Sequence, residues 1–338
     1  MAINYAGGKK NPDLEAIQSE LYADSKTLRD RVIDIQEGFK SGADVYESKV
    51  SVTMKAGSTD AVTADGSIGL GVQKTGVALK SIEYSDVIDD AVLFGTRFEK
   101  SMAAGAFNQV SSEFDKKVLI QVAPAIGEDL ENHLWNGATT ATKAAIASAT
   151  GLSASFKATV AAMPTSEFDS IPVRALYNDS NSKTVAGAGV ADTVKLTGTT
   201  ITSANIAAEY SKLYAGAPDK VINATSSEPR IFAPLAHRQL IKIANNSVGA
   251  AQQINFLVEG SGANEKISYN GVAIEFHPLI NMTILTLPEY LKVLLDLSGD
   301  ASYLEVDKMA NGAQKRYLKN KQSIATWVTN QRYITIQG

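Results

Sequence analysis

The chain has 338 residues, 44% of them hydrophobic and 20% charged, and a formal net charge of −4. These values exclude a disordered or fibrous chain, and the acidic balance excludes wholesale wrapping of nucleic acid, which requires a basic surface. The sequence contains no cysteine, which excludes disulfides and thiolate metal sites. We therefore expect a non-secreted protein of a reducing cytoplasm, without a membrane span, that forms two domains or one core domain with large excursions.

The first predicted element is an amphipathic helix that starts near Pro12 and ends near Gly38. Its apolar residues recur at helical spacing: Leu14, Ile17, Leu21, Leu28, Val32 and Ile35. The opposite face is charged. The segment is therefore either an ordinary surface helix or an arm that lies on a neighbouring copy of the protein.

Residues 45–100 are predicted to form one long β-hairpin with its tip at residues 57–66. Alternating residues give each strand a single apolar face: Val50, Val52, Met54 and Ala56, then Ile68, Leu70 and Val72. The inward parity changes twice beyond Val72, which predicts β-bulges near Gly76 and Ser81. An isolated ribbon is marginal in water, so something outside it must cover its apolar face.

A long helix follows over residues 107–136 and ends at Asn136-Gly137. Its apolar residues are spaced four apart: Val110, Phe114, Val118, Val122, Ile126, Leu130 and Leu134. On a helix of 3.6 residues per turn this stripe drifts by about 40° per step, so one flat partner cannot cover it. Either different layers meet its two ends or the helix bends at Pro124.

The rest of the chain is predicted to be a central α/β portion followed by a strand-rich tail. Residues 138–162 form either a surface helix pair or an excursion loop, and residues 179–198 form a long loop or a weak hairpin. The central helices cover residues 203–214 and the segment from Pro234 to about residue 246. The predicted strands are 220–223, 230–233, a hairpin over 267–276 that turns at Asn270-Gly271, 283–287, 291–297, 303–306, 316–318 and 323–336.

The search for catalytic chemistry finds no constellation that supports an enzyme. None of the three histidines, His133, His237 and His277, lies within four residues of another, which excludes a helix-borne metal pair. The glycine-rich stretch at residues 69–76 lacks both the third glycine of a dinucleotide fingerprint and the lysine of a phosphate loop. We therefore predict no enzymatic activity, no cofactor and no metal site.

One local excess of positive charge stands out near the C-terminus. It comprises Lys308, Lys315, Arg316, Lys319 and Lys321. These residues are candidates for contacts with an adjacent subunit or with DNA phosphates, and the ordinary alternative is a solvated loop.

The order of the elements resembles that of the major capsid protein of tailed double-stranded DNA bacteriophages, which has the Hong Kong 97-type fold. The resemblance covers nearly the whole chain and rests on layout, with the strand and Pro-initiated helix at residues 230–234 in the central part. It implies an α+β fold with five parts. These are an N-terminal arm (1–44), an extended β-hairpin loop (45–100), a peripheral domain with a spine helix (101–150), an axial domain (151–278) and the C-terminal strands of the peripheral domain (279–338).

The resemblance implies a structural protein that self-assembles into hexamers and pentamers of an icosahedral shell around double-stranded DNA. Its expected location is the virion capsid, assembled in the host cytoplasm, with non-specific contacts to packaged DNA and separate portal and decoration proteins as candidate partners. Residues 1–44 are too short for the scaffolding segment of some relatives, so scaffolding is expected from a separate protein or is unnecessary. Two alternatives stay open: an encapsulin-type nanocompartment shell protein, and a soluble α/β enzyme with a site near His237 or His277.

Overall fold

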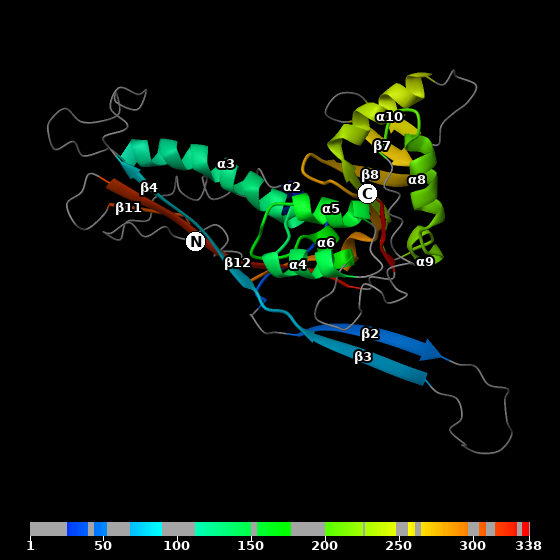
Figure 1. The fold of residues 1–338 in the computed structure, drawn as a ribbon, viewed down its shortest axis with the longest axis horizontal. Coiled ribbons are helices and arrows are strands. Elements are labelled where there is room, and N and C mark those ends of the chain that lie inside the picture. The colour runs from blue at the N-terminus through cyan, green and yellow to red at the C-terminus, as the bar shows by residue number, and fades with distance from the viewer. Residues whose placement is uncertain are drawn as a thin grey trace, which may run out of the picture.

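A computed structural model shows an α+β protein with two sheets, a separate two-stranded ribbon and one helix much longer than the others (Figure 1). The parts of the chain that the structure describes are residues 26–39, 44–52, 68–89, 112–149, 154–176, 200–225, 227–247, 256–260, 265–296, 304–308, 315–329 and 333–337. The described helices are α2 (Lys26–Asp30), α3 (Ser112–Asn136), α4 (Thr140–Ser148), α5 (Ala154–Ala162), α6 (Ile171–Leu176), α8 (Ile206–Ala215), α9 (Asp219–Ile222), α10 (Leu235–Ser247) and the 3₁₀ helix η4 (Pro288–Tyr290).

A five-stranded sheet is built around one long strand near the C-terminus. Its strands are β1 (Asp34–Gln36), β4 (Lys80–Asp89), β10 (Leu291–Leu295), β11 (Leu304–Lys308) and β12 (Lys315–Val328). Strand β4 runs along one edge of β12, while β10 and β11 follow one another along the other edge. All pairs with β12 are antiparallel, and β1 adds to β10 in parallel.

A six-stranded sheet lies in the central part and is completed by strands from the tail. Its order is β13 (Thr335–Gln337), β9 (Thr283–Thr286), β5 (Arg230–Pro234), β8 (Val272–His277), β7 (Lys266–Tyr269) and β6 (Phe256–Glu259). Side chains of α8 and α10 pack against this sheet in one buried cluster that includes Tyr210, Ile241 and Ile274. The β7–β8 hairpin confirms the predicted turn, because Asn270 and Gly271 both have the positive φ that a type I′ turn requires.

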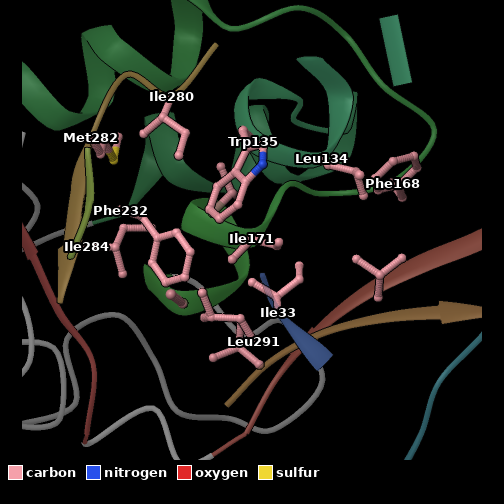
Figure 2. Close-up of a cluster of buried hydrophobic side chains, with 14 of the residues drawn as sticks. Ile33, Leu134, Trp135, Phe168, Ile171, Phe232, Ile280, Met282, Ile284 and Leu291 are labelled. Atoms are coloured by element: carbon pink, nitrogen blue, oxygen red, sulfur yellow. The ribbon is translucent and has the colours of Figure 1, made fainter. Parts of the chain in front are cut away.

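The largest buried cluster joins the two sheets around Trp135, near the end of α3 (Figure 2). The indole is fully buried, and its centroid lies 5.5 Å from that of Phe232 and 5.3 Å from that of His277. Other members come from the five-stranded sheet, as Leu291 does, and from α6, as Ile171 does. Because both sheets share this cluster, the end of α3 holds the two halves of the subunit together.

The N-terminal helix does not reach Gly38 as predicted. Within the described residues it ends at Asp30, Arg31 has a φ of 46°, and the chain then forms strand β1 beside β10. The β-branched residues Val32 and Ile33, which connect the helix to β1, are both buried. The parallel pairing of Asp34–Gln36 with β10 overrides the helical spacing here because it satisfies the backbone of these residues. Residues 1–25 lie outside the described part of the chain.

The predicted hairpin over residues 45–100 is in fact divided between two sheets. Strand β2 (Asp44–Val52) pairs with β3 (Ile68–Gly76) in unbroken antiparallel register, but β4 pairs with β12 instead. Both registers run without a skipped residue, so the bulges predicted at Gly76 and Ser81 are wrong. The parity changes because Val77 and Ile82 pack in different clusters, which lie on opposite faces of the five-stranded sheet. Residues 53–67 and 90–100 lie outside the described part.

Three other predictions are settled by the structure. Residues predicted as strand 220–223 form the short helix α9, because Pro218 and Asp219 supply a helix start. The predicted strands 316–318 and 323–336 are the continuous strand β12 followed by β13. Residues 138–162 adopt the helix-pair alternative as α4 and α5, while residues 179–198 lie outside the described part.

The turn after α3 depends on close packing at Gly137. A Cβ atom there would lie 2.8 Å from the His133 carbonyl oxygen and 2.9 Å from the Ser166 Cβ. The Gly137 carbonyl accepts a hydrogen bond of 2.8 Å from the Ser170 amide, so the turn cannot simply move away. The helix stop at Asn136-Gly137 is therefore confirmed. Glycine is required there because Ser166 and the His133 carbonyl leave no room for a side chain.

We expect Gly137→Ala to lower the free energy of unfolding by about 1–3 kcal/mol, because the added methyl group overpacks this turn. Urea denaturation of the purified subunit measures the change. Removing the opposing methylene with Ser166→Gly relieves one of the two contacts. The penalty of Gly137→Ala should therefore be smaller in the Ser166→Gly background, and an equal penalty in both backgrounds would contradict this explanation.

Candidate assembly surfaces

The ribbon formed by β2 and β3 is a sheet of its own, separate from the five-stranded and six-stranded sheets. Its register runs from Asp44 opposite Gly76 to Val52 opposite Ile68. Figure 1 shows the ribbon extending away from the helices and the two sheets. Neither strand pairs with a third strand among the described residues. Each strand therefore presents an open edge of backbone N–H and C=O groups, which can pair with another chain.

The five basic residues lie on two adjacent strands of the five-stranded sheet. The register places Lys308 of β11 opposite Arg316 of β12, and Lys315 of β12 opposite Asp89 of β4. The predicted alternative of a solvated loop therefore fails for these residues, which are in strands. Residues 309–314, which connect β11 and β12, lie outside the described part.

Acidic residues on the neighbouring strand reduce the predicted excess of positive charge. The Lys319 ammonium lies 2.9 Å from a carboxylate oxygen of Glu83 on β4. The exposed residue Lys321 is opposite the same Glu83 in the register. Sequence reasoning missed this neutralisation because nothing local shows that β4 pairs with β12. A contact of this surface with DNA or with an adjacent subunit stays a prediction.

The two faces of β4 differ in what covers them. Ser81, Glu83, Ser85 and Val87 are exposed on one face. On the other face, the Tyr84 hydroxyl donates a 2.8 Å hydrogen bond to Asp129 of α3, and burial raises the pKa of Tyr84. The long helix thus contacts one face of β4, and the opposite face of this strand is exposed along these four residues.

A buried polar cluster connects the N-terminal segment to the end of α3. The Thr27 amide donates to both carboxylate oxygens of Glu131, at 3.3 and 3.2 Å, and the Thr27 hydroxyl also bonds to this carboxylate. The Trp135 indole N–H lies 2.7 Å from the Thr27 hydroxyl and 3.2 Å from Glu131. His277, at the end of β8, places Nδ1 3.3 Å from a Glu131 oxygen. The cluster therefore joins α2, α3 and the six-stranded sheet.

Sequence reasoning did not identify Glu131 or Thr27 as partners. The one available signal was the spacing of Glu131 and Trp135, which are four residues apart and so share a helix face. That spacing cannot show which distant segment meets the pair. Thr27 lies 104 positions from Glu131 in the sequence.

His237 and Tyr210 form a second buried pair, between α10 and α8. The Tyr210 hydroxyl lies 3.1 Å from His237 Nδ1. Burial lowers the pKa of His237 to about 4 and raises the pKa of Tyr210. The imidazole is therefore neutral near neutral pH and serves as a packing and hydrogen-bonding group.

We expect acid to destabilise the subunit through His237. Its pKa is lower in the folded protein than in the unfolded chain, so the unfolded state binds the extra proton between about pH 6.5 and 4. Stability from this group is complete above that window and falls by about 1.4 kcal/mol per pH unit within it. Urea denaturation at several pH values measures the slope. His237→Gln should reduce the slope relative to the wild type, and an unchanged slope in this variant would contradict the assignment.

The groups with shifted pKa values each have a local structural partner. Besides Tyr84, Tyr210 and His237, Glu265 is affected, because the hydrogen bond from Lys242 lowers the pKa of its carboxyl.

Within the described ranges, no three metal-ligating side chains gather to form a candidate metal centre. Among the described helices, none has the length and apolar character needed to cross a bilayer.

Comparisons with known proteins support the fold through structure alone. No protein-family model and no curated protein matches the sequence. The satellite phage P4 procapsid matches with a TM-score of 0.50 and 10% identity, over 96% of this chain and 98% of that chain. The capsid of the native GTA particle matches with a TM-score of 0.56 and 8% identity, over 93% of this chain and 89% of that chain.

The structure of a third capsid is also similar to this chain. The capsid of the Myoviridae phage XM1 matches with a TM-score of 0.54 and 11% identity, over 92% of this chain and 90% of that chain. At such identities the likeness establishes architecture, and all three matches extend over most of both chains. The chain therefore has the α+β fold of the Hong Kong 97-type capsid proteins.

Proposed function

We propose that this chain is a major capsid protein whose copies assemble as hexamers and pentamers into an icosahedral shell around double-stranded DNA. The observation that carries the proposal is the β2–β3 ribbon, which leaves the subunit without a third strand to cover it within the described residues. The fold of the whole chain is similar to those of the satellite phage P4 procapsid, the GTA capsid and the phage XM1 capsid.

The physical argument starts from the instability of an isolated ribbon. A two-stranded ribbon is marginal by itself in water, so a chain that keeps one must stabilise it by contact with something else. In a closed symmetric assembly that partner is a second copy, because every subunit carries the same ribbon and the same receiving surface. Obligate interfaces commonly bury about 2,000 Å² or more, and an extended ribbon adds contact area without enlarging the core of each subunit.

We assign the parts of the subunit by the same analogy. Residues 1–44 are the arm, 45–100 the extended loop, 101–150 the spine-helix part of the peripheral domain, 151–278 the axial domain, and 279–338 the returning strands. Helix α3 and the β4–β12–β11 sheet then form the peripheral wall of the shell, with one face of the sheet covered by α3. The exposed Lys321 and its neighbour Lys319 are candidates for contact with an adjacent subunit or with packaged DNA.

The proposed shell belongs to a virion assembled in the host cytoplasm. Separate scaffolding, portal and decoration proteins are its candidate partners. The net charge of −4 suits a container that must hold DNA without adhering to it along its whole length. A structural role also suits the buried histidines His237 and His277, which pack against Tyr210 and Trp135.

The proposal is tested by expressing the full chain alone and analysing it by sedimentation velocity and electron microscopy. Capsomers, tubes or closed shells are the expected products, and a monodisperse monomer at high concentration would contradict the proposal. The contents of purified particles from infected cells separate the two shell functions. Packaged double-stranded DNA supports a capsid, whereas a cargo enzyme without genome would favour the encapsulin-type alternative.

A further inference from the structure

Both legs of the ribbon converge on one small buried cluster. The cluster consists of Phe39, Val77, Leu79, Leu294, Ala325 and Trp327, and we call it the ribbon anchor. Phe39 precedes β2 in the chain, and Val77 directly follows β3. Leu79 directly precedes β4, and the remaining members come from β10 and β12 of the five-stranded sheet. The ribbon is therefore tied to the body of the subunit from both of its strands.

The ribbon anchor lies on the face of the sheet opposite the main core. Leu294 is paired with Ala325 in the β10–β12 register, so these side chains share a face. Their chain neighbours Val293 and Ile324 belong to the core around Trp135. Because side chains alternate along a strand, the anchor and the core cover opposite sides of the same strands.

Phe39 and Val77, which flank the ribbon in the sequence, both contact the five-stranded sheet. The Phe39 amide donates a 2.9 Å hydrogen bond to the carbonyl of Leu295, at the end of β10. Val77 is only 3% exposed and follows Gly76, the β3 residue paired with the first residue of β2. The sequence from Val77 to Leu79 then joins β4, which is hydrogen-bonded along β12. Because Val77 directly follows β3, the β3 leg cannot change direction without withdrawing this side chain from the anchor.

Trp327 is the largest side chain in the anchor, and Arg174 approaches its ring from α6. It is 3% exposed, and the guanidinium carbon of Arg174 in α6 lies 6.0 Å from the centre of its ring. A planar cation at this distance favours a fixed ring position. The platform for the ribbon is thus part of the rigid sheet and α6.

We propose that the ribbon anchor is a positioning element that fixes the direction of the β2–β3 ribbon and thereby presents it to a neighbouring copy. This inference rests on the proposed shell function for its consequence, but the ordering of the ribbon is a property of the subunit alone. Since the ribbon has no third strand among the described residues, its base is the place where its direction can be set. Val77, Trp327 and Phe39 are positioning residues in this sense.

The test compares two valine-to-alanine variants that remove the same atoms at similar burial. Val77→Ala weakens the anchor, and Val272→Ala, at 4% exposure in the six-stranded sheet, is the matched control. Hydrogen exchange of the β2 and β3 amides is measured in the unassembled subunit. Val77→Ala should accelerate that exchange by about tenfold or more, while Val272→Ala leaves it near the wild-type rate. Equal exchange in the two variants would overturn the anchor proposal.

A second pair of variants guards against loss of folding. Trp327→Phe keeps an aromatic ring in the anchor, whereas Trp327→Leu removes it while remaining apolar. Trp327→Leu should accelerate exchange in the ribbon more than Trp327→Phe does, with circular dichroism confirming that both subunits fold. Identical exchange in these two variants counts against the proposal.

Assembly gives the functional readout and separates this inference from the proposed function. Val77→Ala should lower the yield of shells several-fold relative to Val272→Ala at matched protein concentration. If even the wild-type chain fails to assemble, the shell function is wrong, and the exchange measurements still decide whether the anchor orders the ribbon. If shells form equally well from both valine variants, the anchor does not position the ribbon for assembly.

Discussion

Replacing Trp135 with alanine should lower the free energy of unfolding by about 3–5 kcal/mol, which is a large fraction of the roughly 5–15 kcal/mol that keeps an ordinary domain folded. The side chain is fully buried and lies against Phe232 and His277, in the cluster that joins the two sheets. Its removal leaves a large cavity and also takes away the indole donor that reaches Thr27 and Glu131. Urea denaturation followed by circular dichroism measures the loss.

The variant Trp135→Phe separates packing from hydrogen bonding at this position. It keeps an aromatic ring near Phe232 but leaves the Thr27 hydroxyl and Glu131 without the indole N–H. We expect a smaller loss, of about 1–3 kcal/mol, as is usual when a buried polar group loses a partner. A Trp135→Ala subunit with nearly wild-type stability would show that the cluster does not hold the two sheets together.

Replacing the whole ribbon, residues 44–76, with a short Gly-Ser linker should abolish shell assembly while leaving the subunit folded. Asp44 and Gly76 are directly opposite in the register, so a few residues can close the gap. Within the described part of the chain, β2 and β3 pair with each other and with no other strand, so their removal breaks no other sheet. Sedimentation velocity measures assembly, and thermal unfolding measures the integrity of the subunit.

A smaller deletion controls for the large change in chain length. Removing only residues 57–66, which lie outside the described part of the chain, should impair assembly and leave the fold unchanged. The ribbon-deleted subunit should also fail to join shells when it is mixed with an excess of wild-type protein, because it has lost the contact that it would offer. Closed shells formed by the ribbon-deleted subunit alone would contradict the proposed role of the ribbon.

Sequence reasoning succeeded where a structure is set by residues close together in the chain. The turn at Asn270-Gly271 follows from two adjacent residues that tolerate a positive φ. The end of α3 at Asn136 follows from a helical stripe that stops before glycine. The alternation of apolar residues before and after the tip predicted paired strands, and β2 and β3 do pair in regular register.

Errors arose where a distant strand competes with local preference. The spacing of Leu28, Val32 and Ile35 suits a helix, but β10 offers a parallel partner, and β1 forms instead. The parity change beyond Gly76 predicts bulges only if residues 45–100 belong to one hairpin. In the structure Val77 and Ile82 meet opposite faces of a sheet that contains β12, which is more than 200 residues further along the chain.

The candidate site divides in the same way. The sequence identified the five basic residues, but the tertiary structure placed them on β11 and β12 and brought Glu83 to Lys319. The Glu131 cluster and the ribbon anchor were not predicted, because each joins segments far apart in the chain.

The sequence alone determined the kind and order of most elements and the presence of a two-stranded ribbon, since these follow from periodicity and turn chemistry within a few residues. Only the tertiary structure decided that β4 leaves the ribbon for β12, that Trp135 joins two sheets, and that Val77 packs in one cluster with Trp327. The reason is that many strands can form hydrogen bonds with the same edge of a sheet. Which strand pairs there depends on the apolar side chains that the pairing buries, and these come from segments far apart in the sequence.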